Sequence, residues 1–577
     1  MSSTQIVNYK VTIDAPWTHY VKISGNFLYT GDDDQFFLYL PIWSPGSYLV
    51  REYSRHIRKV TITLNSGKHL YFEKAEKNKW LVDRKLNEEK LKGQKIHFEY
   101  EVYCNEISVR TSHINLGHAF LHGPSLFMSI EGYENCEAEV DITFPPCWTK
   151  LNTSLEDISP SREIFKYKAK NYDELLDSPI EIGNQFTDGV QVSGVNHYFV
   201  WMGLPKKIYG DLKKDLKVII ERITDFWGEI PFESYTFIGH FFPNKFGGIE
   251  HLNSTAVHYD PIKLGTEKGY KNFLSLLAHE YFHAWNVKRV RPIELGPFNY
   301  SKENYTRMHW LTEGFTSFVD DLFVFNSGIT NEEDYLDILK KKFNFYLDSP
   351  GKYFDSLEEA SFDAWIKLYR PHENLKNISV NYYLNGALCF FCLNSLLYLQ
   401  GRSIKEFAHH LWQRYLQDKS KGIQKFEVLQ IIENLAGKSV ADEFDHLLTS
   451  TVEFPLEESA KRCGLELVWK KSEKLNWGFD WREKEGNLFV SNIQLDGPGF
   501  KAGLNNEDEI LAVGGMRITK NNYLDWQETL KENETLDFLI SRLGYLLQID
   551  VTLGYPKKEI ENIKVVNKND FIGSLSL

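Results

Sequence analysis

The sequence has few cysteines and no long hydrophobic run, and both absences exclude classes of protein. Only 6 of its 577 residues are cysteine, too few for a disulfide framework. The longest apolar stretch, residues 387–399, is too short to span a bilayer and contains an asparagine. The N-terminal residues lack the basic and apolar regions of a signal peptide. We therefore expect a soluble, cytoplasmic protein with no membrane partner.

Positive charge is also scarce. Lys and Arg number 66 against 79 Asp and Glu, which gives a net charge of −13, whereas nucleic-acid binding needs a basic surface. Charged residues at 25% and hydrophobic residues at 42% are typical of a globular protein and exclude a disordered chain, a collagen and a coiled-coil rod. Aromatic residues reach 15%, enough for several cores. The length suggests about four domains.

The pattern of residues changes twice along the chain. Up to about residue 190, β-rich and partly alternating segments such as 9–13, 35–43, 59–64 and 95–103 predict a β-sandwich-like domain. From about residue 462, short β-like runs and one short helix indicate a separate β-rich module. Its expected strands are 487–493, 508–515, 536–543 and 547–553, and its expected helix is 521–532.

Between these two parts, the sequence predicts mainly helices. We expect helices at 211–227, about 271–288 and 306–325, short strands near 234–242, a loop at 291–304, and mostly helix from there to about 450. Cys389 and Cys392 form a CxxC pattern, but they lie in an apolar, helix-like run. Core packing explains them better than a redox or metal role.

The strongest chemical signal is an HExxH pattern, His279-Glu280-Tyr281-Phe282-His283. On a helix, residues i and i+4 share one face, so His279 and His283 can bind one cation, and imidazole suits Zn²⁺. Glu280 is turned away by about 100° and can act as a base for an activated water. The alternative is a helix with two ordinary histidines. The apolar flanks argue against it, because burying these groups without a ligand is costly.

A catalytic zinc site usually has a third protein ligand and one open position. The candidate is Glu313, in Trp310-Leu311-Thr312-Glu313-Gly314-Phe315 at the start of the next apolar helix. The alternative is a glutamate stabilised by the dipole at a helix N-terminus. Two aromatic residues and a glycine beside the acid favour a buried position, over the two histidines.

Two further patterns carry weaker signals. In Gly247-Gly248-Ile249-Glu250, the glycines permit close approach to a ligand, and Glu250 could accept hydrogen bonds from an amine. A Gly-Gly turn followed by a solvated acid fits these residues better when they are taken alone. In Tyr382-Tyr383, a phenol near the metal could stabilise an oxyanion, although core packing is the simpler explanation.

Together these segments resemble the glycyl aminopeptidase family of zinc metallopeptidases, within the gluzincin clan. Residues 279–292 are similar to the zinc helix of that family and the segment after it, and residues 310–315 to its third-ligand helix. Residues 247–251 are similar to its exopeptidase motif, and residues 41–57 to a signature of its N-terminal domain. The resemblance covers nearly the whole chain.

This resemblance implies the roles of individual residues. His279, His283 and Glu313 would bind one zinc ion, and Glu280 would be the general base. Glu250, with Gly247 and Gly248, would bind the free α-amino group of a peptide, which makes the protein an aminopeptidase with a preference for N-terminal Gly or Ala. The catalytic tyrosine would be Tyr383 or Tyr382. The choice stays open because Asn385-Gly386 stands where the clan has Lys-Gly. Separately, the spacing from His283 to Glu313 is longer than in most gluzincins, which fits this family.

The C-terminal module resembles a PDZ domain. Trp477, Gly478 and Phe479 look like its carboxylate-binding loop, and residues 499–504 and 508–511 look like the turn and strand of PDZ domains in bacterial proteases. Such a groove would bind the C-termini of peptides or proteins as an added strand. The alternative is a degenerate PDZ domain with a purely structural role.

The resulting prediction is a multidomain α+β protein. Its domains are an N-terminal β-sandwich-like domain (1–190), a thermolysin-like zinc domain (191–345), an α-helical part (346–460) and a PDZ domain with a C-terminal tail (461–577). Two other functions stay open: a zinc endopeptidase to which the PDZ domain delivers substrates, and a peptide-binding scaffold without catalysis.

Overall fold

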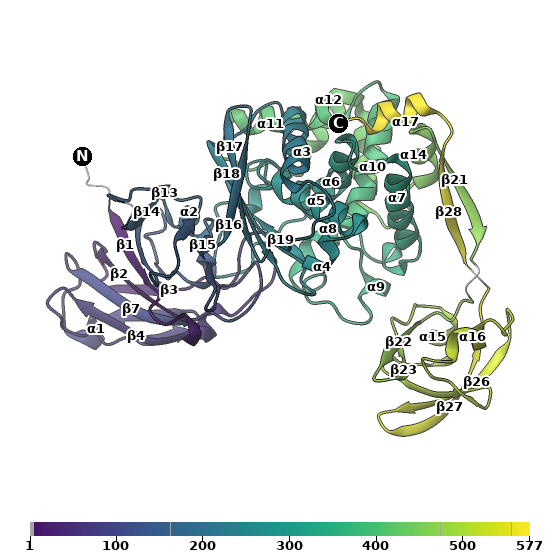
Figure 1. Cartoon of the computed structure of the whole chain (residues 1–577), viewed down its shortest axis with the longest axis horizontal. Coiled ribbons are helices and arrows are strands. Elements are labelled where there is room, and N and C mark those ends of the chain that lie inside the picture. Colours follow the sequence, from purple (N-terminus) through teal and green to yellow (C-terminus); the bar gives the residue numbers. More distant parts are fainter. Residues whose placement is uncertain (1–4, 162, 473–474, 556) are drawn as a thin grey trace. The chain divides into compact units, whose positions relative to one another are not determined.

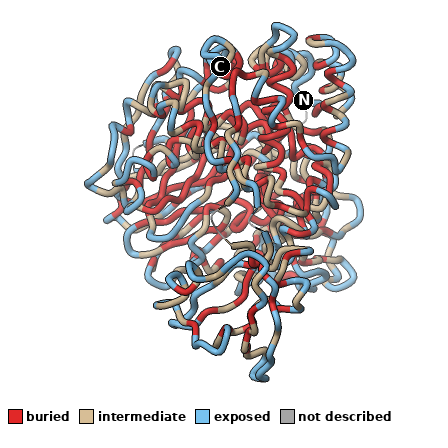
Figure 2. The backbone as a smooth tube through the Cα atoms, turned by 90° about the vertical axis from the view of Figure 1, so that its right-hand side faces the viewer, coloured by how far each residue is buried: buried red, intermediate tan, exposed pale blue. Residues whose placement is uncertain are grey.

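The computed structural model describes residues 5–161, 163–472, 475–555 and 557–577. The chain forms two compact units. The first comprises Met1–Tyr305, Asn326–Ile329 and Ala408–Gln424, and the second comprises Thr306–Phe325, Thr330–Phe407 and Lys425–Leu577. Figure 1 shows the elements coloured along the sequence. In Figure 2, which colours the backbone by burial, buried segments lie mainly in the interior and exposed segments mainly at the outside.

The N-terminal part of the first unit is built from three sheets, as the β-rich sequence predicts. The first contains β13 (Glu156–Asp157), β14 (Phe165–Ala169), β11 (Glu137–Thr143), β1 (Ile6–Thr12), β2 (Tyr20–Leu28), β7 (Lys95–Tyr103) and β4 (Ile57–Leu64), in this order. The second has β10 (Ser129–Ile130), β3 (Gln35–Tyr39), β6 (Lys79–Asp83) and β5 (Glu73–Glu76). The third has β12 (Lys150–Asn152), β15 (Ile180–Gly183), β9 (His118–Leu121) and β8 (His113–Ile114). Every second residue of β7 is buried, which is the period of a strand with one face on a core.

A fourth sheet follows, with the order β16 (Phe186–Val192), β17 (Val195–Met202), β18 (Ser234–Phe241), β20 (Ser254–Tyr259) and β19 (Gly247–Glu250). The three central strands are parallel and β16 and β19 are antiparallel edges. All of β20 is buried, as expected for a strand that is covered on both faces. Helix α3 (Leu212–Trp227) connects two of the parallel strands and packs against α5 (Glu267–Phe282).

Helix α3 agrees with the predicted 211–227, whereas α5 differs from the predicted 271–288. It begins four residues earlier, where the Thr266 side chain accepts a hydrogen bond from the Gly269 N–H. It ends at Phe282, and Val287 has a φ of 96°, which no helix can contain. The buried Arg289 donates a hydrogen bond from Nη1 to the Ala284 carbonyl just past the helix end. Its positive charge is favourable near the end of a helix.

The part of the second unit up to Arg462 is mainly helical, as predicted. Its larger helices are α6 (Phe315–Asn326), α7 (Glu332–Leu347), α10 (Leu384–Leu399), α12 (Lys425–Ala436), α13 (Lys438–Thr449) and α14 (Leu456–Arg462). Helix α10 is buried along most of its length, and its Cys389 and Cys392 are buried, free thiols, as expected for core packing. In the described part of the chain, no single helix is long and apolar enough to cross a membrane.

The C-terminal module has a sheet with the order β22 (Asp480–Lys484), β23 (Asn487–Ser491), β24 (Glu509–Val513), β26 (Thr535–Arg542) and β27 (Tyr545–Thr552). The antiparallel pair of β21 (Leu465–Lys471) and β28 (Lys558–Val565) precedes and follows it in the chain. Strands β23, β24, β26 and β27 lie at the four predicted strands, whereas the sequence did not predict β21, β22 or β28. The predicted helix 521–532 is only one short turn, α16 (Tyr523–Gln527), and Trp526 is its one buried residue. So little packing cannot hold a longer helix.

Candidate metal centre

Helix α5 carries the HExxH residues in its last turn. His279 is its last basic residue and His283 is the C-cap, so both imidazoles project from the same end of the helix. Their ring centroids are 4.7 Å apart and the rings are nearly perpendicular. The i, i+4 geometry expected from the sequence is therefore present.

The hydrogen bond of His283 fixes which of its nitrogens can bind a cation. His283 is buried, and its Nδ1 lies 2.9 Å from the Asn286 carbonyl oxygen. Because a carbonyl can only accept, Nδ1 carries the proton and donates it. Nε2 then keeps its lone pair, which is the arrangement of a metal-binding histidine with a supporting carbonyl.

Glu280 lies on the same helix, against strand β19. A Cβ built on Gly248 would lie 2.1 Å from Glu280 Oε1. Only a glycine at position 248 therefore leaves room for the Glu280 carboxylate where it lies. Glu280 is buried. Gly247 and Gly248 belong to β19 and do not form a turn, so the simple Gly-Gly turn considered from the sequence is wrong.

Glu313 lies in a π-helical turn, Trp310–Gly314, which continues directly into α6. Such turns are rare and are frequent at functional sites. The turn packs closely on α10, because a Cβ on Gly314 would lie 2.7 Å from the Cα of Gly386. Gly386 is the glycine that follows the tyrosine pair, so this close contact explains its presence. The Glu313 side chain is buried.

His279, His283 and Glu313 each offer one ligand atom, and these atoms lie within 4.8 Å of one another. Two imidazole nitrogens and one carboxylate oxygen are a typical donor set for a catalytic Zn²⁺ with an open fourth position. The residues present therefore fit the metal that the HExxH pattern indicates.

Glu250 is buried at the end of strand β19, next to the N-terminal domain. A Cβ on Gly46 would lie 2.4 Å from Glu250 Oε2, and Gly46 has a φ of +79°. Both the close contact and the left-handed backbone therefore favour glycine at this position. Arg110 donates from Nη2 to the Gly248 carbonyl at 2.8 Å and so ties β19 to the same domain. Glu250 is a packed acid and not the solvated one considered as the alternative.

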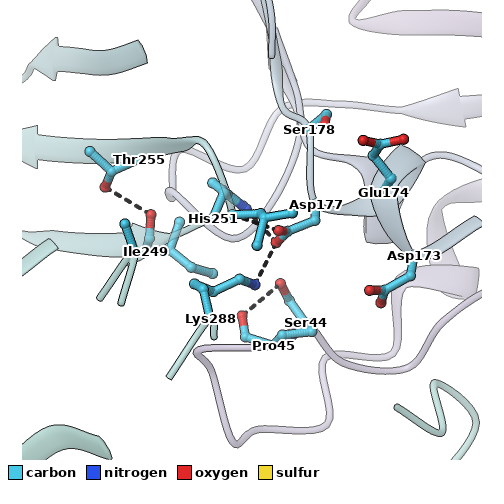
Figure 3. A network of polar contacts seen from close by, with 12 residues as sticks. Ser44, Pro45, Asp173, Glu174, Asp177, Ser178, Ile249, His251, Thr255 and Lys288 are labelled. Carbon is cyan, nitrogen blue, oxygen red and sulfur yellow. Dashed lines mark hydrogen bonds and ion pairs between the residues drawn. The ribbon is translucent and has the colours of Figure 1, made fainter. Parts of the chain in front are cut away.

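Asp177, His251 and Lys288 form a polar network in the same region (Figure 3). His251 Nδ1 and Lys288 Nζ lie 3.0 and 2.8 Å from Asp177 Oδ1. Burial alone would raise the pKa of Asp177, but Lys288 and His251 outweigh burial and hold that pKa at about 2. Asp177 is therefore a carboxylate at neutral pH, with both partners oriented toward it.

A cavity of about 280 Å³ lies beside this network, lined among others by Gly46, Glu250, Asp177, Lys288 and Arg291. It is the space into which a small ligand next to Glu250 would fit. No sequence pattern pointed to Asp177. Gly46 and Lys288 were not singled out either, although they lie in the segments 41–57 and 279–292 that resemble the family.

The two candidate tyrosines differ in their surroundings. Tyr382 is fully buried, with its ring stacked on His309 and on Tyr383. Tyr383 is only partly buried, and its hydroxyl lies 3.2 Å from that of Tyr369. Burial first, and then the Glu313 carboxylate, raise the pKa of Tyr383 well above its ordinary value. Its hydroxyl therefore stays protonated as a hydrogen-bond donor.

The expected carboxylate-binding loop lies in the C-terminal module. Trp477 and Phe479 are part of the core of this module. Gly478 has a φ of +70°, and a Cβ there would lie 2.7 Å from the Pro498 nitrogen. Its N–H donates to Asn476 Oδ1 at 3.2 Å. A cavity of about 540 Å³ borders the loop.

Two domain models of one peptidase family match parts of the chain. Residues 272–389 match the M61 glycyl aminopeptidase domain, and residues 8–184 match the N-terminal domain of the M61 peptidases. No curated protein matches the chain.

Many solved structures are similar to the chain, and two of them show how far the likeness extends. An aminopeptidase N family protein from Idiomarina loihiensis shares 29% sequence identity, with a TM-score of 0.91 over 99% of this chain and 100% of that one. An M1 zinc metallopeptidase from Deinococcus radiodurans is 13% identical, with a TM-score of 0.51 over 79% of this chain and 95% of that one. The second likeness concerns the fold alone.

Proposed function

Because the chain carries both domains of the M61 glycyl aminopeptidase family and is a hydrolase of the zinc aminopeptidase type, we propose that it removes small N-terminal residues, Gly or Ala, from peptides. The observation that carries this proposal is the buried carboxylate of Glu250, which lines the cavity beside Asp177 and Lys288. The α-ammonium group of a peptide with a free N-terminus is a cation that can donate hydrogen bonds to this carboxylate.

His279, His283 and Glu313 are the proposed ligands of one catalytic zinc ion. Zinc, when bound, supplies Lewis-acid chemistry by polarising a water and a carbonyl oxygen. The His283 proton on Nδ1 is held by the Asn286 carbonyl, so the ring keeps the tautomer that the metal requires. No other neutral form of this ring leaves Nε2 free to bind.

Glu280 is the proposed general base. It accepts a proton from the attacking water and passes it to the nitrogen of the leaving amine. Because Gly248 has no side chain, strand β19 can run close beside this carboxylate. The strand therefore limits where the Glu280 side chain can lie. Burial also keeps bulk water from competing for the proton.

Tyr383 is the proposed donor to the carbonyl oxygen as negative charge develops on it. Its raised pKa keeps the hydroxyl proton in place, and its partial exposure leaves it reachable by substrate. The ring of Tyr382 stacks on that of Tyr383, at a centroid distance of 5.0 Å.

For the C-terminal module, we propose a PDZ-like role in binding the C-termini of peptides or proteins at the cavity beside Gly478. If the module delivers substrates to the zinc site, the enzyme would be an endopeptidase. If the chain binds peptides without cleaving them, it would be a scaffold.

One assay separates these possibilities. Peptides of the same sequence are offered with a free or an acetylated N-terminus, and the products are identified by mass spectrometry. An aminopeptidase releases single N-terminal residues from the free peptides only. Internal cleavage of both peptides identifies an endopeptidase, and no cleavage by a zinc-loaded protein identifies a scaffold.

A further inference from the structure

A second group of histidines lies on other elements of the first unit. His113, His118 and His240 come from β8, β9 and β18, so two different sheets supply them. One ring nitrogen of each lies within 4.8 Å of those of the others. Their exposed fractions are 2%, 2% and 0%. Three imidazoles that converge in a dry interior are a costly arrangement unless something binds them.

Two of the ring nitrogens face each other directly. His113 Nε2 and His118 Nε2 lie 3.2 Å apart, close enough for one ring to donate a hydrogen bond to the other when no ion is bound. Two nitrogens that each bind a tetrahedral zinc at 2.0–2.1 Å lie about 3.3 Å apart. In the third histidine, His240, Nε2 is used by a carboxylate, and the remaining Nδ1 is buried without a hydrogen-bond partner among the described residues.

Glu181, on β15, holds two of these rings. Its two carboxylate oxygens accept hydrogen bonds from His118 Nδ1 at 2.7 Å and from His240 Nε2 at 2.9 Å. Both rings therefore carry their proton on the side of Glu181 and keep a lone pair on the opposite side. A fully buried carboxylate that orients ligand histidines in this way is a recurrent support of zinc sites.

A fourth histidine stands beside the cluster. His258, on β20, has its ring centroid 5.1 Å from that of His240. It is buried, and its Nε2 has no hydrogen-bond partner among the described residues. In a purely structural polar network, this nitrogen and His240 Nδ1 would both be unsatisfied at a cost of about 1–3 kcal/mol each.

We propose that His113, His118 and His240 bind a second zinc ion, with His258 beside them. The ion joins sheet β12-β15-β9-β8 of the N-terminal domain to the central strands of the fourth sheet. Closed by protein ligands and far from open solvent, it has a structural role, distinct from that of the zinc at His279 and His283.

The test is the zinc content of a double variant, His279→Phe with His283→Phe, in which every residue of the second cluster is intact. The purified protein is loaded with zinc, freed of loose metal by gel filtration and measured by elemental analysis. We expect one zinc per chain in this variant and two in the wild type. A folded double variant without zinc would overturn the proposal, whatever the activity of the wild type.

Further variants locate the ion. Adding His113→Phe or His240→Phe to the double variant should remove the remaining zinc. His197→Phe is the matched control, because His197 is also a buried histidine of the fourth sheet but hydrogen-bonds to Tyr281. Added to the double variant, it should leave one zinc per chain. Cobalt bound to the double variant should show the visible absorption of a tetrahedral site, and an octahedral spectrum would contradict closure by histidines.

Discussion

Gly248 and Glu280 are so close that no side chain fits between them: a Cβ on Gly248 would lie 2.1 Å from Glu280 Oε1. The glycine of strand β19 therefore fixes how near the strand runs to the proposed base. Because a misplacement of about 1 Å can cost about 10²-fold in rate, Gly248→Ala should lower kcat by about that factor while zinc content is unchanged. The measurement is steady-state hydrolysis of Ala-4-nitroanilide with elemental analysis.

Gly265→Ala is the control for this change. Gly265 is the half-buried C-cap residue of α4 (Pro261–Leu264), and a Cβ there would meet its nearest atom at an ordinary 3.5 Å. It should keep full activity. Full activity in Gly248→Ala as well would show that the contact with Glu280 does not matter for catalysis.

Glu280→Gln keeps the size of the side chain and removes its ability to take a proton. Since general-base catalysis contributes about 10²–10⁴-fold, kcat should fall by at least about 10²-fold, and zinc should remain bound. Zinc loss would assign Glu280 to metal binding, and unchanged kcat would remove it from the mechanism.

Glu250→Ala should act on substrates with a free N-terminus. A lost hydrogen bond between charged groups is worth about 1.5–3 kcal/mol, so kcat/KM for Ala-4-nitroanilide should fall about 10- to 100-fold. The exposed Glu233→Ala is the control and should have no effect. If wild type and Glu250→Ala hydrolyse free and acetylated peptides alike, Glu250 does not bind the amine.

Removing the hydroxyl group of Tyr383 or of Tyr382 should affect kcat differently. Tyr383→Phe removes the donor to the developing oxyanion, which is typically worth about 10²–10³-fold in kcat, with little change in KM. Tyr382→Phe keeps the ring that stacks on His309 and Tyr383 and should change kcat much less. The reverse order of the two effects would assign the role to Tyr382.

Asp177 makes the stability of the protein depend on pH. Its folded pKa of about 2 lies below the ordinary 3.8, so its ion pair stabilises the fold above about pH 4 and this stability is lost as pH falls toward 2. The shift corresponds to about 2 kcal/mol. Thermal unfolding should show Asp177→Asn destabilised at pH 7, with a smaller difference from the wild type toward pH 3. The exposed Asp33→Asn should match the wild type throughout, and a difference for Asp177→Asn that does not shrink with acid would contradict the pair.

Local patterns in the sequence predicted where several helices and strands lie. Contacts between residues far apart in the chain could not be predicted from these patterns. The apolar flanks of His279 and the amphipathic pattern of 211–227 are local signals, and both α5 and α3 are found. The end of α5 was missed because it depends on Arg289 and on the backbone of Val287. Gly46 against Glu250, Gly314 against Gly386 and His118 against Glu181 join residues from separate elements, which one sequence cannot reveal.

The central claim is tested most directly by release of 4-nitroaniline from Ala- and Gly-4-nitroanilide, before and after chelation and after zinc is returned. N-acetylated Ala-4-nitroanilide is measured in parallel. We predict hydrolysis of the free substrates only, loss of activity with the chelator and recovery with zinc. Equal hydrolysis of the acetylated substrate, or activity that survives complete removal of zinc, would contradict a zinc aminopeptidase that uses Glu250 to bind the amine.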